Sequence, residues 1–202
     1  MKAEANRGTR PARTRRGGRI GAALAAGGLG MTAAIAGAAM ITVISPTPAA
    51  AQQTTNRVEA FRDWSVFKAD AGGPVCWVVT QPQSSVATRG GKPVQVRRGE
   101  IYLTVAVRPR QGVTNEIAMV GGYPFKDGST VKAAIGDKSF SMFTEGESAW
   151  TYPADDAAIV AAMKAGTAAV FTGVSSRGTT TTDRFSLLGF TDALTSAQRL
   201  CK

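Results

Sequence analysis

Two glutamates, Glu145 and Glu147, stand a few residues before Trp150 and are the side chains whose spacing could serve acid/base chemistry. Glycoside hydrolases use two carboxyl groups that flank the scissile bond, and an aromatic ring beside them would offer a platform for a sugar. At a spacing of two residues both side chains would leave the same face of a strand, whereas in a turn both would face water. We expect the turn, and a carboxylate-based glycan hydrolase is the alternative.

Histidine is absent from all 202 residues. Histidine is the usual general base near neutral pH and the commonest metal ligand, so Ser-His-Asp, Cys-His and histidine-based metal sites are excluded. We therefore expect a protein that is not an enzyme, with no cofactor and no metal site.

Three aromatic residues, Tyr123, Phe125 and Trp150, could line a groove for a sugar or a peptide. The glycines at 121 and 122 would allow another backbone to approach closely. Glycine and proline in G-G-Y-P-F equally suit an ordinary turn between strands, which is the alternative interpretation.

A basic segment between Pro82 and Gly99 contains four cations: Arg89, Lys92, Arg97 and Arg98. Such a segment could contact phosphate groups of an anionic polymer or lipid. The alternative, which we favour, is a solvated hairpin connection. The same two interpretations apply to Ser175-Ser176-Arg177-Gly178, where a single cation stands at an expected turn.

The formal net charge of +10 is concentrated at the N-terminus. Residues 1–51 carry seven Lys and Arg against Glu4, which leaves 17 basic and 13 acidic residues in the rest of the chain. The remainder is only mildly basic, so we expect no nucleic-acid partner.

The N-terminal charge precedes an apolar run over 20–44, and the small residues Ala49 and Ala51 follow it. This order is typical of a secretory signal peptide, which contacts the membrane transiently. We predict a signal peptide over 1–51 with cleavage after Ala51, and a polar tether over 52–60. The general secretory route is favoured over the twin-arginine route, because G-G-R-I after Arg15-Arg16 departs from the usual apolar pattern. The expected location is the periplasm or the cell surface.

Cys76 and Cys201, the two cysteines of the chain, lie near the ends of the remaining domain, 61–202. In an exported protein such a pair predicts a disulfide bond, which would close a long loop. A free reactive thiol is the alternative.

Short runs of β-branched and aromatic residues between Gly, Pro, Asp and Asn clusters predict antiparallel strands. The clearest runs are 61–69, 75–81, 101–107, 131–135, 140–144, 168–175 and 179–188. A helix is expected where Asp155 and Asp156 precede an apolar face and Lys164 and Gly166 end it. Thr191 would cap a short terminal helix. The predicted fold is all-β, an antiparallel β-sandwich of short strands, with one helix near 154–165 and a short C-terminal helix.

Several stretches of the domain resemble the invasion-associated locus B (IalB) family of exported proteins from Gram-negative bacteria. They are F-R-D-W-S-V, V-C-W-V-V-T-Q-P, R-G-E-I-Y-L-T-V with R-P and N-E-I, G-G-Y-P-F-K-D-G-S, F-x-M-F-T-E-G-E-S-A-W, A-A-M-K-A-G and S-S-R-G-T-T-T-T-D-R-F-S-L-L-G-F-T-D-A-L. Together they cover nearly all of 61–201. The resemblance implies an IalB-like β domain and brings no catalytic residues. We expect an exported, non-enzymatic envelope protein that binds an envelope or host-cell component, with no prediction of its oligomeric state.

Overall fold

The structure, a computed structural model, describes residues 56–202. The predicted signal peptide, its cleavage site at Ala51 and the tether up to residue 55 lie outside the described residues. Within 56–202, no helix is both long and apolar enough to cross a membrane.

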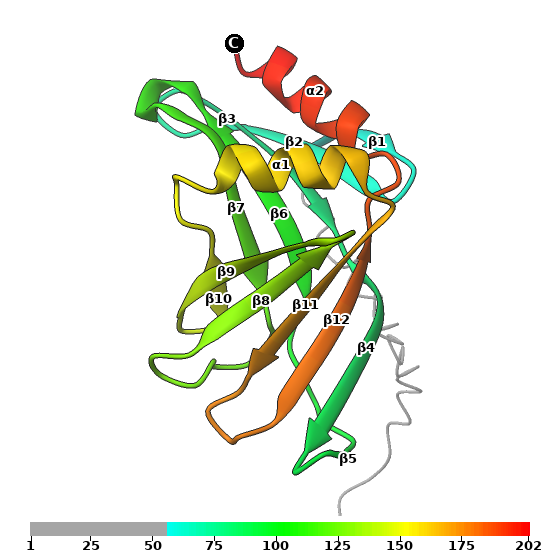
Figure 1. The fold of residues 1–202 in the computed structure, drawn as a ribbon. Helices are drawn as coiled ribbons and strands as arrows, with labels where there is room; N and C mark the ends of the chain where they lie inside the picture. Colours follow the sequence, from blue (N-terminus) through cyan, green and yellow to red (C-terminus); the bar gives the residue numbers. More distant parts are fainter. Residues whose placement is uncertain (1–55) are drawn as a thin grey trace, which may run out of the picture. The chain divides into compact units, whose positions relative to one another are not determined.

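The described chain is all-β and carries two helices, as predicted (Figure 1). The strands are β1 (Arg57–Phe61), β2 (Trp64–Asp70), β3 (Pro74–Thr80), β4 (Pro82–Arg89), β5 (Lys92–Pro93), β6 (Tyr102–Arg108), β7 (Val113–Val120), β8 (Thr130–Ile135), β9 (Lys138–Glu145), β10 (Ser148–Trp150), β11 (Ala168–Val174) and β12 (Thr180–Ser186). The helices are α1 (Asp156–Ala165) and α2 (Phe190–Leu200), and a single 3-10 turn spans Pro109–Gln111.

The twelve strands within 56–202 form one antiparallel sheet in the order β1-β2-β3-β6-β7-β10-β9-β8-β11-β12-β4-β5. The two layers of the predicted sandwich are therefore halves of one continuous sheet. Side chains from both halves belong to a single core, and the buried Trp64 indole on β2 donates to the Ser186 carbonyl at the end of β12 over 3.0 Å.

Strand register follows from the burial of alternate residues. Val66, Val78, Val105 and Ile117 lie opposite one another on β2, β3, β6 and β7, and all four are fully buried. A shift of one residue would turn each of these side chains to the outer face, so this row fixes the pairing.

Both helices lie at one end of the sheet, away from the β4–β5 hairpin (Figure 1). Helix α1 buries an apolar face that includes Ile159, Ala162 and Met163, and it packs on β7 and α2. Helix α2 packs on β2 and β3. Cys201 directly follows α2 and forms the predicted disulfide with Cys76 on β3, with Cα atoms 5.9 Å apart.

Four expectations about element boundaries are wrong. The strand expected over 61–69 is a hairpin, in which Arg62 and Asp63 form the turn and Phe61 pairs with Trp64. Because β1 pairs with β2, residues 57–60 belong to the sheet rather than to a tether. The imperfect alternation of this stretch thus reflects a turn.

The stretch after Pro82 is strand β4, which pairs with β12, and not a loop connection throughout. Its only buried residue is Ala87, so the apolar alternation that identifies a strand is missing.

Helix α2 begins at Phe190 instead of after a Thr191 cap. Gly189 precedes it with φ +90°, and a Cβ at this position would lie 2.0 Å from the carbonyl oxygen of Phe61. The close approach of Phe61 therefore requires glycine at the position immediately before the helix.

Candidate functional site

A pocket of about 560 Å³ lies at the end of the sheet that carries the β4–β5 hairpin. Four guanidinium groups line it together with one carboxylate and one phenol. We call it the arginine pocket; these lining residues are Arg89, Arg97, Arg98, Arg177, Glu147 and Tyr123.

Strand pairing brings two of the arginines together. Because Thr180 on β12 lies opposite Thr88 on β4, Arg89 comes beside the β11–β12 turn that carries Arg177. The Nε and NH2 groups of Arg89 donate to Thr179 Oγ1 over 3.2 and 2.7 Å, which fixes the guanidinium at the pocket.

The other two arginines lie on the segment that joins β5 to β6. The backbone N–H of Gly99 donates to the carbonyl of Gly122 over 2.8 Å and so attaches this segment to the one after β7. Gly122 has φ +68°, and a Cβ there would lie 2.7 Å from the Gly99 oxygen, so this contact requires glycine. The N–H of Ser176 donates to the Pro124 carbonyl over 2.9 Å and holds the β11–β12 turn against the same segment.

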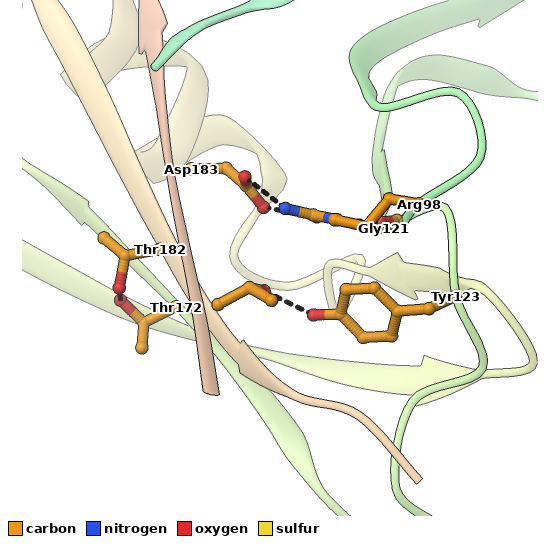
Figure 2. Close-up of polar contacts among 7 residues, drawn as sticks. Arg98, Gly121, Tyr123, Thr172, Thr182 and Asp183 are labelled. Atoms are coloured by element: carbon orange, nitrogen blue, oxygen red, sulfur yellow. Dashed lines mark hydrogen bonds and ion pairs between the residues drawn. The ribbon is translucent and has the colours of Figure 1, made fainter. Parts of the chain in front are cut away.

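Arg98 reaches across to β12 and forms a bidentate ion pair with Asp183 (Figure 2). Both N–H···O distances are 2.7 Å, and Arg98 Nε also donates to the Gly121 carbonyl over 2.9 Å. The side chain of Arg98 is 8% exposed and that of Asp183 is fully buried. Since its charge is neutralised, Arg98 forms part of the pocket wall rather than a free cation.

Tyr123 lies beside this ion pair, with its ring centroid 4.9 Å from the guanidinium carbon of Arg98. Its hydroxyl shares a short hydrogen bond with Thr181 Oγ1, drawn in Figure 2. Burial raises the pKa of the Tyr123 phenol above its ordinary value, although the Thr181 hydrogen bond and Arg98 act in the opposite direction. The phenol is therefore neutral at physiological pH and acts as a hydrogen-bonding group, not as a base.

The remaining arginines of the pocket, Arg89, Arg97 and Arg177, have no carboxylate within ion-pair distance among residues 56–202. Arg97 and Arg177 are exposed at the pocket surface. Several uncompensated guanidinium groups in one concave site raise the local positive potential and offer forked donors that match phosphate and carboxylate geometry. This arrangement can bind an anion.

The structure brings together only part of the predicted site. Tyr123, Arg89, Arg97 and Arg98 share the arginine pocket. Lys92 is exposed on β5 and does not line it.

The three aromatic rings do not share a groove. Phe125 is 4% exposed and packs edge-on against Tyr123 as part of the core, with ring centroids 5.0 Å apart. Trp150 lines a second pocket of about 550 Å³ with Phe143 and Glu145.

The two candidate carboxylates are also separated. Glu147 lies in the β9–β10 turn, as expected, whereas Glu145 is the last residue of β9 and pairs with Ser148. Glu145 lines the second pocket and Glu147 lines the arginine pocket. Because the two carboxylates line different pockets, the geometry does not support a paired-carboxylate hydrolase.

The second pocket contains Asp156 in the first turn of α1. Burial raises the pKa of this carboxyl, although the hydrogen bond from Thr151 Oγ1 lowers it; the charges of Glu116 and Asp155 raise it further. Across residues 56–202 no cluster of three or more Cys, Asp or Glu side chains could hold a metal ion.

Asp183 escaped prediction because it lies in T-T-T-T-D-R-F-S, where the threonines and the neighbouring Arg184 suggest a solvated strand. Its position in the strand could have identified it as buried, because Thr181, Asp183 and Phe185 are alternate residues and all three are buried. A carboxylate at an inward position requires a cation, and Arg98 supplies it.

Comparisons with known proteins agree with the family resemblance and with the fold described above. A family model described as "Invasion associated locus B (IalB) protein" matches residues 64–198. The chain is similar in structure to invasion associated protein b from Bartonella henselae, with a TM-score of 0.50 and 15% sequence identity over 70% of this chain and 95% of that chain. At this identity the likeness shows a common fold alone. No curated protein matches the sequence.

Proposed function

Since the chain belongs to the invasion-associated locus B family, we propose that it is an exported, non-enzymatic protein of the cell envelope. It binds an anionic envelope or host-cell component, and the arginine pocket is its binding site.

The observation that carries this proposal is the convergence of Arg89, Arg97 and Arg177 on one pocket without carboxylate partners among the described residues. Guanidinium groups held close together repel one another, and an anionic ligand relieves that repulsion. Since these side chains are exposed, the attraction would weaken as salt is added.

Export is supported by the Cys76–Cys201 disulfide and by the basic and apolar N-terminal sequence. Disulfide bonds persist in the periplasm and outside the cell, and are rare in the reducing cytosol. The periplasm or the cell surface is therefore the proposed location.

A binding role is supported over catalysis by the chemistry of the site. The chain has no histidine, and the phenol of Tyr123 is held neutral by burial, which raises its pKa. Glu147 is the single carboxylate that lines the arginine pocket among the described residues. A site of this kind holds a charged ligand but has no pair of groups for acid/base steps.

The test of binding uses the protein purified from its own envelope fraction, with polyphosphate and phosphatidylglycerol vesicles as probes. The variant Arg97→Gln/Arg177→Gln should lose at least ten-fold in affinity for both probes, and wild-type binding should weaken steeply with salt. The control, Lys132→Gln/Arg184→Gln, removes the same charge from exposed strand positions outside the pocket and should bind within about two-fold of wild type. Equal losses in the two double variants would mean that net charge, and not the pocket, attracts anions.

Export is tested separately by the intact mass of the protein from the envelope fraction. A mass that begins at Gln52 and gains two hydrogens on reduction is expected. A full-length mass with free thiols, or retention in the cytoplasm, would overturn the proposed location.

A further inference from the structure

We infer that the arginine pocket takes a phosphorylated sugar, in which the arginines hold the phosphate and Glu147 accepts hydrogen bonds from the sugar hydroxyls. This inference rests on the proposed function and adds the chemical class of the ligand.

The phosphate side of the site consists of Arg89, Arg97 and Arg177. Thr179 already engages Nε and NH2 of Arg89, so this guanidinium is oriented before a ligand binds. The N–H groups that Thr179 does not engage remain for a phosphate, and an oriented guanidinium loses less freedom on binding than a flexible ammonium does. The exposed Arg97 and Arg177 can approach the same group from the two other segments.

Glu147 is the feature that a site for a bare anion would not need. Its carboxylate lines the arginine pocket and has no basic partner within ion-pair distance among the described residues. The backbone that carries this exposed side chain is held in place, because the Gly121 N–H donates to the Glu147 main-chain carbonyl over 2.8 Å and the Phe125 N–H donates to the Gly146 carbonyl over 2.8 Å.

A carboxylate in this position repels a ligand that is anionic throughout and accepts hydrogen bonds from hydroxyl groups. The fitting ligand therefore has an anionic end beside a neutral, hydroxyl-rich part. The pocket volume of about 560 Å³ lies in the range of small-molecule sites, which suits one sugar ring with its phosphate.

Two sources could supply such a group: a glycolipid that carries phosphorylated sugars, or a free sugar phosphate. The recognised chemistry is the same in both cases. Vesicles with and without a phosphorylated glycolipid, compared with soluble glucose 6-phosphate, distinguish the two sources.

The experiment compares the dissociation constants of inorganic phosphate and glucose 6-phosphate by calorimetry, with glucose as a blank. The wild-type protein should bind glucose 6-phosphate at least ten-fold more tightly than phosphate. Glu147→Ala should bring this ratio close to one without weakening phosphate itself, since a repelling charge is removed. Glu147→Gln, which keeps an acceptor of the same shape, should lie between the two.

The matched control is Glu145→Ala, which removes the same charge from the same β9–β10 hairpin, at a position that lines the other pocket; its ratio should equal that of wild type. Arg177→Gln should weaken both ligands at least ten-fold and leave the ratio unchanged.

A wild-type ratio near one, or equal effects of Glu147→Ala and Glu145→Ala, would refute the sugar-phosphate inference while leaving anion binding intact. Failure of phosphate, polyphosphate and anionic vesicles to bind at all would refute the proposed function as well.

Discussion

The ion pair between Arg98 and Asp183 gives the sharpest test of how this fold is stabilised. Replacing Arg98 with methionine keeps a long apolar side chain but removes the guanidinium. Asp183 would then lose both of its 2.7 Å charge-assisted hydrogen bonds, and its side chain has no exposure to water. The carbonyl of Gly121 would lose a donor at 2.9 Å.

The expected loss of stability follows from these contacts. Breaking a buried ion pair by removing one partner costs about 3–5 kcal/mol, because the remaining charge stays buried and unpaired. The unpaired Gly121 carbonyl adds about 1 kcal/mol. We expect Arg98→Met to lower the free energy of unfolding by about 4–6 kcal/mol, a large part of the 5–15 kcal/mol typical of a domain.

The double variant Arg98→Met/Asp183→Leu removes both charges and fills the space with apolar groups. Well-packed apolar replacements of a buried pair are often neutral, so only the Gly121 carbonyl remains unsatisfied and the loss should be about 1–2 kcal/mol. The double variant should therefore be more stable than Arg98→Met alone. Arg184→Met, an exposed neighbour of Asp183 on β12, should change stability by less than about 0.5 kcal/mol.

Urea unfolding at pH 7 with the disulfide intact measures these differences, with the fluorescence of Trp64, Trp77 and Trp150 as the signal. A loss of less than about 1 kcal/mol for Arg98→Met, or a loss in the double variant as large as that of Arg98→Met alone, would refute this account of the ion pair. Either result would mean that water or other groups solvate the isolated carboxylate.

Two other predictions concern the disulfide and helix α1. Cys76→Ala/Cys201→Ala opens a loop with a sequence separation of 125 and should lower the free energy of unfolding by about 5 kcal/mol through chain entropy; a change in urea midpoint worth less than about 1 kcal/mol would contradict this account. Because burial raises the pKa of Asp156 above its ordinary value of 3.8, the folded protein binds this proton more tightly than the unfolded chain does. The charged Asp156 therefore destabilises the fold above its folded-state pKa, and this cost disappears as the pH falls towards 3.8. Asp156→Asn keeps an acceptor for Thr151 and should raise the urea midpoint at pH 7 but not at pH 3.5; a lower midpoint at pH 7 would mean that attraction between the carboxylate and the N-terminus of α1 dominates.

Local patterns predicted those parts of the fold whose side chains alternate or share a helix face. Strands β6, β8, β9 and β11 and helix α1 follow the apolar pattern closely. Strand β4 does not, because four consecutive residues, Gln83 to Val86, are exposed and its place depends on backbone pairing with β12. Such pairing between distant segments leaves no trace in the local sequence.

Most individual residues of the candidate site could be predicted from the sequence, but their arrangement around one pocket could not. Arg89, Arg97 and Arg98 were identified as one basic segment, and Tyr123 as part of another site. Only the sheet order, with β12 between β11 and β4, brings Arg177 beside Arg89. Arg97 and Arg98 are adjacent and of the same residue type, yet their roles differ. Arg98 is buried against Asp183, whereas Arg97 is exposed.

The different environments of Arg97 and Arg98 indicate what the buried ion pair between Arg98 and Asp183 contributes to the structure. If an apolar pair at 98 and 183 can be nearly as stable, then stability alone does not explain why charges occupy the interior. The guanidinium of Arg98 is held at three points, one on the segment after β7 and two on β12. These directional contacts fix the backbone of the β5–β6 segment relative to β12, and an apolar pair would not. The position of Arg97 at the pocket depends on that segment, because it directly precedes Arg98. The buried ion pair between Arg98 and Asp183 therefore positions the exposed Arg97. The free energy lost in desolvating the two charges is offset by the defined geometry that the pair gives to the ligand site.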